Sequence, residues 1–202
     1  MKRIPVLIVI VVALALTTAA AAAGVIANRG HDPWPWMGPS MMGSGTATSE
    51  PDYLVEMIAH HREAVAAAGE LARSDRPEMR AFGESIVVTQ TAQIEQMTSW
   101  LAEWYPDVST ATDYQPMMRD LTGLSGDRLD RAFLQDMIRH HMAAVMMSQH
   151  LLWRGTAHDD VARLARTIRD DQHAEIIQMQ RWLTQWFHAG WPMMGGRAGG
   201  RA

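Results

Sequence analysis

The sequence predicts an all-α protein, an antiparallel four-helix bundle built from two repeated helical hairpins. Three observations support this fold class. Apolar residues recur at the helical period through residues 50–188, no window shows the sustained alternation of a strand, and the second half of this region repeats the first. Short breaks within each half and a longer one between them are typical of two antiparallel helix pairs.

The composition narrows the function before any motif is considered. Eighteen basic and 22 acidic residues give the 202-residue chain a net charge of −4, without the basic stripe that nucleic-acid binding requires. Cysteine is absent, which excludes disulfides, thiolate metal sites and cysteine nucleophiles. The 16 methionines and nine histidines supply thioether and imidazole groups, which are ligands that suit copper.

The N-terminal segment, residues 1–27, is predicted to be a signal peptide or an N-terminal membrane anchor that forms a hydrophobic helix. Lys2 and Arg3 precede an apolar stretch, as in exported proteins. Small residues at 19–23 would permit cleavage, whereas residues 4–26 together reach the roughly 20 apolar residues that span a bilayer. Either reading predicts an extracytoplasmic protein, periplasmic or on the cell surface, and an uncleaved segment would associate with the membrane.

Two helices are expected in the first half of the body. Residues 28–49 are rich in Met, Gly and Pro and are typical of a linker. Ser49 then resembles a helix N-cap, and the helical pattern continues to about Arg73. A second helix, with Pro77 in its first turn, is expected to run to Trp104.

A connector, residues 106–124, separates the two halves, and one short helix is expected in it around residues 114–121. Ser125 can cap a third helix, which is expected to end near Gly155. The body then needs one more helix to complete a second antiparallel pair.

The fourth helix follows a turn that contains Thr156 and Asp159, which have the spacing of a capping box. This helix is expected to reach about His188, so that residues 50–188 form one duplicated four-helix domain. Residues 189–202 are a Gly- and Met-rich tail.

The internal repeat is one helical hairpin, duplicated. Residues 57–61 match residues 137–141 at an offset of 80. In the second helix of each hairpin the offset is 82, as for Gln90 and Gln172, so two residues were gained or lost in the turn. Two such hairpins can pack with approximate two-fold symmetry, which would bring equivalent residues together.

Each repeat carries a Met-x-x-His-His motif on its first helix. Residues three and four apart share a helix face, so the methionine and the two histidines of each motif cluster. The predicted metal ligands are Met57, His60, His61, Met137, His140 and His141. Second choices nearby are Met97, Met179 and His173.

A structural role for the histidines is the alternative to metal binding. Gln90 and Gln93 interrupt the apolar stripe of one helix, and Gln172 and Glu175 interrupt the stripe of its counterpart. Buried polar groups need partners, which either a metal or a hydrogen-bond network can supply. The shared register of the two motifs favours the metal.

Met-rich segments flank the body and give a second signal for copper. Residues 34–43 and 188–195 combine Trp, Pro, Met and Gly in similar order. Methionine in such a context has no core to fill, so these flanks are candidate capture sites for Cu(I), with His31 or His188 as further ligands.

Two blocks of the sequence resemble the domain-of-unknown-function 305 (DUF305) family. Residues 133–145 contain its Asp-Met-Ile-Arg-His-His signature, and residues 172–183 resemble its second block. The resemblance covers residues 50–188 and implies a ferritin-like four-helix bundle, export, and copper binding through Met and His, as in CopM-like members. Glu56 and Gln93 depart from the pattern of the second repeat, so a site with two equivalent carboxylates is not expected.

The sequence therefore predicts an extracytoplasmic copper-binding protein that sequesters or transfers Cu(I) or Cu(II) and has no catalytic residues. The alternative is a non-metal, membrane-tethered helical interaction module, whose Trp-rich ends would contact a partner. A metalloenzyme ranks last, because the di-iron carboxylate pattern, the zinc motif and the phosphate loop are all missing.

Overall fold

The computed structural model describes residues 49–188, which form four long helices and, within that range, no strand. The helices are α1 (Glu50–Gly69), α2 (Pro77–Trp104), α3 (Gly126–Arg154) and α4 (Asp159–Phe187), with a short 3-10 helix, η2 (Glu70–Arg73), after α1. The predicted all-α bundle is confirmed. The predicted N-terminal hydrophobic helix and the two Met-rich flanks lie outside the described residues, except for His188.

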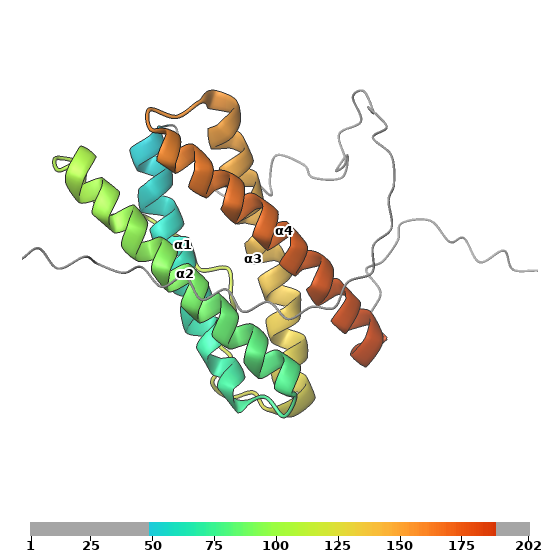
Figure 1. The fold of residues 1–202 in the computed structure, drawn as a ribbon. Helices are drawn as coiled ribbons and strands as arrows, with labels where there is room; N and C mark the ends of the chain where they lie inside the picture. The colour runs from blue at the N-terminus through green and yellow to red at the C-terminus, as the bar shows by residue number, and fades with distance from the viewer. Residues whose placement is uncertain (1–48, 189–202) are drawn as a thin grey trace, which may run out of the picture. The chain divides into compact units, whose positions relative to one another are not determined.

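The four helices are organised as two hairpins. Helix α1 packs along α2, and α3 packs along α4, while the two hairpins meet mainly through α1 and α3 (Figure 1). Turns of a few residues join the helices within each hairpin, and the long connector between α2 and α3 passes from one hairpin to the other. This arrangement places the first helix of each repeat, which carries the histidines, at the junction of the hairpins.

Two hydrophobic clusters form the core, and the histidines mark the boundary between them. Along α1, residues up to Ile58 belong to one cluster and residues from Ala64 onward to the other. Along α3 the order is reversed, with the change between Ile138 and Ala144. Both His pairs fall at these changes and are almost fully buried, so a polar layer separates two apolar regions.

The connector is extended rather than helical, and the short helix expected around residues 114–121 is therefore wrong. The backbone N–H groups of Met117 and Met118 both donate to Glu63 Oε1 on α1, at 2.8 Å. Arg119 pairs with the buried carboxylate of Asp136 on α3. These tertiary bonds replace the i→i+4 bonds of a helix and fasten the connector to both hairpins.

An ion pair on aromatic rings closes one end of the bundle. Arg76, in the turn of the first hairpin, donates to Asp130 Oδ2 at 2.7 Å, and Asp130 is fully buried. The guanidinium also lies over the rings of Trp186 and Phe187, 4.9 and 5.2 Å from their centroids. A turn of one hairpin is thus held to both helices of the other.

The repeat-equivalent residues close the opposite end. His158 pairs with Glu50, with Nδ1 and Oε1 2.6 Å apart, and its ring stacks on Trp104 at 3.9 Å. Glu50 Oε2 also accepts from the N–H groups of Ala157 and His158 just before α4. The capping box expected at the start of α4 is therefore wrong: α4 begins without a side-chain cap, and Glu50 binds the turn that precedes it.

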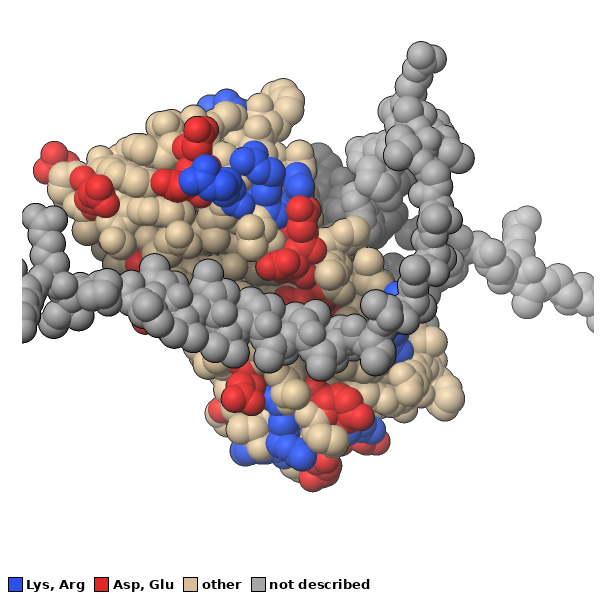
Figure 2. Space-filling view, viewed as in Figure 1, with Lys and Arg blue, Asp and Glu red and all other residues tan. Residues whose placement is uncertain are grey.

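None of the helices within residues 49–188 is long and apolar enough to cross a membrane. On the face shown in Figure 2, acidic and basic side chains are intermixed over the described surface rather than gathered in one patch.

Candidate metal centre

His60 and His140, which are equivalent in the repeat, meet at the junction of α1 and α3. Their rings stack with centroids 3.6 Å apart and planes within 3° of parallel. His60 Nε2 lies 3.0 Å from the carbonyl oxygen of His140, so this nitrogen carries the hydrogen and donates it. The expectation that the repeat brings equivalent histidines together is confirmed.

Glu63 and Tyr114 complete a cluster with these two histidines. One ligand atom each from His60, Glu63 and His140 all lie within 4.8 Å of one another. His140 Nε2 is 3.3 Å from Glu63 Oε2. The Tyr114 hydroxyl, on the connector, lies 3.1 Å from His60 Nδ1, 3.5 Å from His140 Nε2, and within hydrogen-bonding distance of Glu63 Oε2.

The Tyr114 hydroxyl therefore occupies the centre of a group of potential ligands. Its single hydrogen is shared between two acceptors, Glu63 Oε2 and His60 Nδ1. A site with more lone pairs than hydrogens attracts positive charge, and a metal cation could take the place of the hydroxyl if the connector moved aside.

His61 and His141 face the second helix of their own hairpins. His61 Nε2 lies 2.8 Å from Gln93 Oε1 on α2, and His141 Nε2 lies 2.7 Å from Glu175 Oε2 on α4. Both oxygens are acceptors, so each Nε2 donates and each Nδ1 keeps its lone pair. Carboxylate or carbonyl groups that receive the second ring N–H are the usual partners of metal-binding histidines.

Three buried Nδ1 atoms have no hydrogen-bond partner among the described residues, namely those of His61, His140 and His141. The buried Oε1 atoms of Gln90 and Gln172, another repeat-equivalent pair, are also unpartnered there. We call His60, His61, His140 and His141 the histidine layer. The unpaired Nδ1 atoms of this layer are all hydrogen-bond acceptors. A cation or an ordered water molecule would supply the partner that each of them needs.

Burial keeps three imidazoles of the layer, those of His60, His61 and His140, neutral. Burial and the neighbouring histidines hold the pKa of His60 well below its usual value of 6.5, and burial lowers the pKa of His61 to about 3. The pKa of His140 is also lowered, mainly by burial and against the effect of Glu63. Neutral imidazole is the form that binds metals, so these histidines remain competent at mildly acidic pH.

Glu63 supplies the negative charge of the cluster. Burial raises its pKa, but hydrogen bonds from His140, Tyr114 and the Met118 N–H outweigh burial and lower the pKa to about 2. Burial and the hydrogen bond to Glu63 raise the pKa of Tyr114. The cluster thus contains a carboxylate, neutral imidazoles and a protonated phenol at neutral pH.

The structure places the predicted methionines in the hydrophobic clusters on either side of the histidines. Met57 and Met137 are fully buried, in different hydrophobic clusters. Met97 and Met179 are likewise core residues, while His173 is exposed on α4. A ligand role for these side chains stays a prediction.

Sequence reasoning missed Glu63 and Tyr114. Glu63 lies three residues after His60, on the same helix face, which is a signal that could have found it. Its repeat counterpart is Ala143, so the repeat gave no support. Asp136, the acid of the second motif, is instead neutralised by Arg119 and Arg139.

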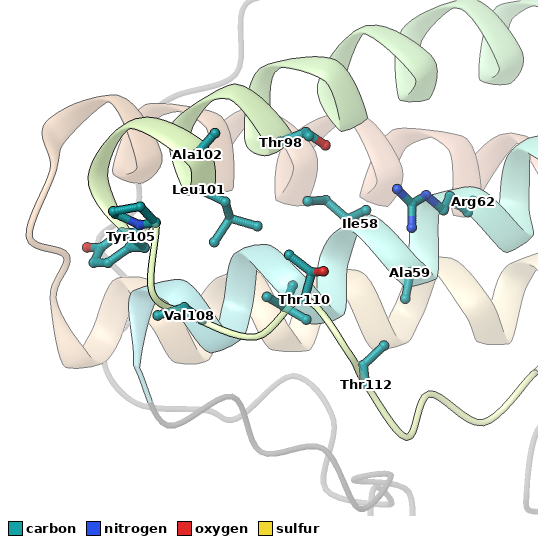
Figure 3. Close-up of a pocket in the computed structure, with 12 residues that line it drawn as sticks. Ile58, Ala59, Arg62, Thr98, Leu101, Ala102, Tyr105, Val108, Thr110 and Thr112 are labelled. Carbon is teal, nitrogen blue, oxygen red and sulfur yellow. The ribbon is translucent and has the colours of Figure 1, made fainter.

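The pocket in Figure 3 is a different feature. It lies between α1, the end of α2 and the start of the connector, and its labelled lining includes Ile58, Arg62, Thr98 and Thr110. The lining contains no histidine, methionine or carboxylate, so it offers none of the ligands that copper prefers.

Comparison with known proteins assigns the family. Residues 50–183 match the model of DUF305, a domain of unknown function. The structure resembles CopM in its Cu(I)-bound form (TM-score 0.62, 27% identity, covering 69% of this chain and 98% of CopM). CopM was also solved with Cu(II) bound, with a TM-score of 0.62, 27% identity, and coverage of 68% of this chain and 97% of that one.

A third similar structure is a DUF305 protein of Streptomyces coelicolor that is thought to be secreted. Its TM-score is 0.60 and its identity 27%, over 66% of this chain and 89% of that one. A search of curated proteins finds no match. The family match spans both hairpins and every residue of the histidine layer, and the chain belongs to the DUF305 family.

Proposed function

We propose that this protein binds copper, as Cu(I) or Cu(II), at the histidine layer and sequesters or transfers it without catalytic turnover. The observation that carries the proposal is the set of three buried Nδ1 lone pairs. Hydrogen bonds from Nε2 orient the rings of His61 and His141, and Nε2 of His140 faces Glu63. Copper binding by CopM, which has the same fold, supports the choice of metal.

Two regions of the layer can hold the ion. On the connector side, His60, Glu63 and His140 offer imidazole nitrogen and carboxylate oxygen, a set that suits Cu(II). On the interior side, the Nδ1 atoms of His61 and His141 offer nitrogen alone, and the nearby buried methionines Met57 and Met137 are the candidate thioethers for Cu(I). His140 is adjacent to both, which makes it the residue to test.

Replacing His140 with Gln is expected to weaken copper binding by about 100-fold, because even outer partners of a ligand contribute 10–100-fold. Competition titration of the full-length chain against a chromophoric Cu(I) chelator, and against a Cu(II) chelator, measures this change. Glu103→Gln, at an exposed position on α2, is the control and should leave affinity unchanged. Wild-type affinity in a helical, cooperatively unfolding H140Q protein would contradict the proposal.

A second prediction concerns the Tyr114 hydroxyl. Tyr114→Phe removes the group that competes for the lone pairs of His60 and Glu63, so Cu(II) affinity is expected to rise by roughly tenfold, which is about 1.4 kcal/mol. Tyr53→Phe is the control, because Tyr53 is also buried and its hydroxyl bonds to Ser148, outside the layer. Unchanged affinity in Y114F would place the metal away from the connector side.

We also propose that the protein acts outside the cytoplasm, released or anchored by residues 1–27. The basic start and the apolar stretch of this segment support export, and so does the Streptomyces relative. Fractionation of cells with an antibody to the full-length protein tests the proposal, and recovery of the protein only in the cytosol would refute it.

The alternative of a non-metal interaction module is less well supported. Its candidate surface was the four tryptophans at the ends of the bundle, but Trp104 stacks on His158 and Trp186 lies under Arg76. Trp100 and Trp182 stack on these two rings in turn. The rings therefore hold the two hairpins together and are only partly exposed.

A further inference from the structure

A second group of soft donors lies on the C-terminal half of α3, outside the histidine layer. Met146, His150 and Trp153 follow one another at spacings of four and three residues, which places them on one face of the helix. The His150 and Trp153 rings are 6.3 Å apart between centroids and tilted by 40°. Thioether, imidazole and indole thus occupy two neighbouring turns.

Packing does not account for this group. Trp153 is 80% exposed, the most exposed large hydrophobic side chain within the described residues. Met146 is half-buried but packs against neither hydrophobic cluster, in contrast to Met142 and Met147. A methionine outside the core, next to a histidine and a solvent-exposed indole, needs a reason other than core filling.

This group of donor side chains has no equivalent in the first repeat. At the offset of 80, the equivalent residues are Ala66, Glu70 and Arg73, and the last two form an ordinary ion pair. Helix α1 also ends at Gly69 and continues as η2, whereas α3 stays α-helical to Arg154. Only the second repeat therefore keeps both the donor side chains and the regular spacing between them.

We propose that Met146, His150 and Trp153 form a surface site for a soft monovalent cation, Cu(I) or its analogue Ag(I). The Met146 sulfur and one imidazole nitrogen of His150 would donate lone pairs, while the electron-rich face of Trp153 would attract the cation. The set contains no carboxylate, so it does not favour hard divalent cations. Because all three residues lie on one helix near the surface, binding there requires no opening of the bundle.

The site would complement the buried layer. A short, exposed ligand set exchanges its ion readily, whereas the histidine layer is closed by the connector and the core. The surface site is independent of the buried one, because it shares no residue with it. An ion could thus be captured at the surface whether or not the layer is occupied.

Calorimetric titration of the full-length protein with Ag(I) tests the site. The variant M146A/H150E installs the residues of the first repeat, and it is expected to bind one Ag(I) fewer than wild type at unchanged far-UV circular dichroism. W153F should keep the same number of ions but bind this one about threefold more weakly, consistent with an exposed cation–π contact of roughly 0.5–1 kcal/mol. W153F should also lose part of the change in tryptophan fluorescence that accompanies Ag(I) binding.

T167E, at an exposed position on α4, controls for the added negative charge and should retain every Ag(I). Unchanged stoichiometry and affinity in M146A/H150E would overturn the surface site. The two sites are distinguished by H140Q, which should lose binding at the layer but keep the ion that M146A/H150E loses. If H140Q also removed that ion, the surface site would be refuted.

Discussion

Lowering the pH from 7.5 to 4.5 is expected to remove most of the stability of the bundle. The folded protein holds the pKa of His61 near 3, and that of His60 well below 6.5, whereas the unfolded chain titrates near 6.5. Below pH 6.5 the unfolded chain therefore binds more protons, and stability falls with pH until the folded-state pKa is reached. His61 alone accounts for about 3 kcal/mol at pH 4.5.

His60 and His140 add to this loss, because their pKa values are lowered too. His60 and His61 together give a slope that approaches about 3 kcal/mol per pH unit, against a typical total stability of about 5–15 kcal/mol. Burial and the nearby Asp52 raise the pKa of Glu56, and a raised carboxyl pKa makes the fold more stable as the pH falls. This effect is confined to the pH range in which Glu56 itself titrates. The lowered pKa of Glu63 removes further stability below about pH 4.5.

Urea unfolding followed by circular dichroism at pH 7.5, 6.5, 5.5 and 4.5 measures the slope. H61Q removes one titrating group and should flatten the slope by about 1.4 kcal/mol per pH unit. V88A, at an exposed position that carries no titrating group, should leave the slope as in wild type. Stability that stays constant from pH 7.5 to 4.5 would show that the histidines of the layer are hydrated and not buried as described.

Arg76→Ala is expected to destabilise the fold by about 3 kcal/mol, because it leaves the buried carboxylate of Asp130 without its partner. The equivalent change at the opposite end, His158→Ala, should cost less. Glu50 would keep its bonds from Tyr105 and from the backbone N–H groups of residues 157 and 158. Thermal and urea unfolding at pH 7.5 compare the two variants.

The double variant R76M/D130L is the control for this prediction. Replacing both partners of a buried ion pair by apolar side chains is often neutral, so most of the lost stability should return. Equal effects of R76A and H158A would show that the aromatic stacking, rather than the buried carboxylate, dominates at both ends.

The helices and their pairing could be predicted from the sequence, because the apolar period is a local signal and the repeat can be recognised by aligning the two halves of the chain. The connector could not be predicted in this way. Its polar residues are compatible with a short helix, but Glu63 draws the N–H groups of Met117 and Met118 into tertiary bonds. The start of α4 could not be predicted for the same reason, because Glu50, more than 100 residues away, binds the turn that precedes it.

The candidate site could be predicted only for those residues that occur at equivalent positions in both repeats. The stacking of His60 on His140 follows from the shared register, and Gln93 and Glu175 are recognisable as polar interruptions of apolar stripes. Tyr114 has no counterpart in the repeat, and its approach depends on the path of the connector. The role of Met57 and Met137 as ligands stays a prediction.

The stacked pair of His60 and His140 also bears on the origin of the molecule. A contact between the same residue of two repeats is the internal form of an isologous contact, which a symmetric homodimer makes across its axis. A single ancestral hairpin could therefore have formed the imidazole pair by associating with its own copy. Fusion into one chain then allowed the two copies to differ. The repeats do differ, because Ala143 stands at the position equivalent to Glu63, and Glu175 at the position equivalent to Gln93.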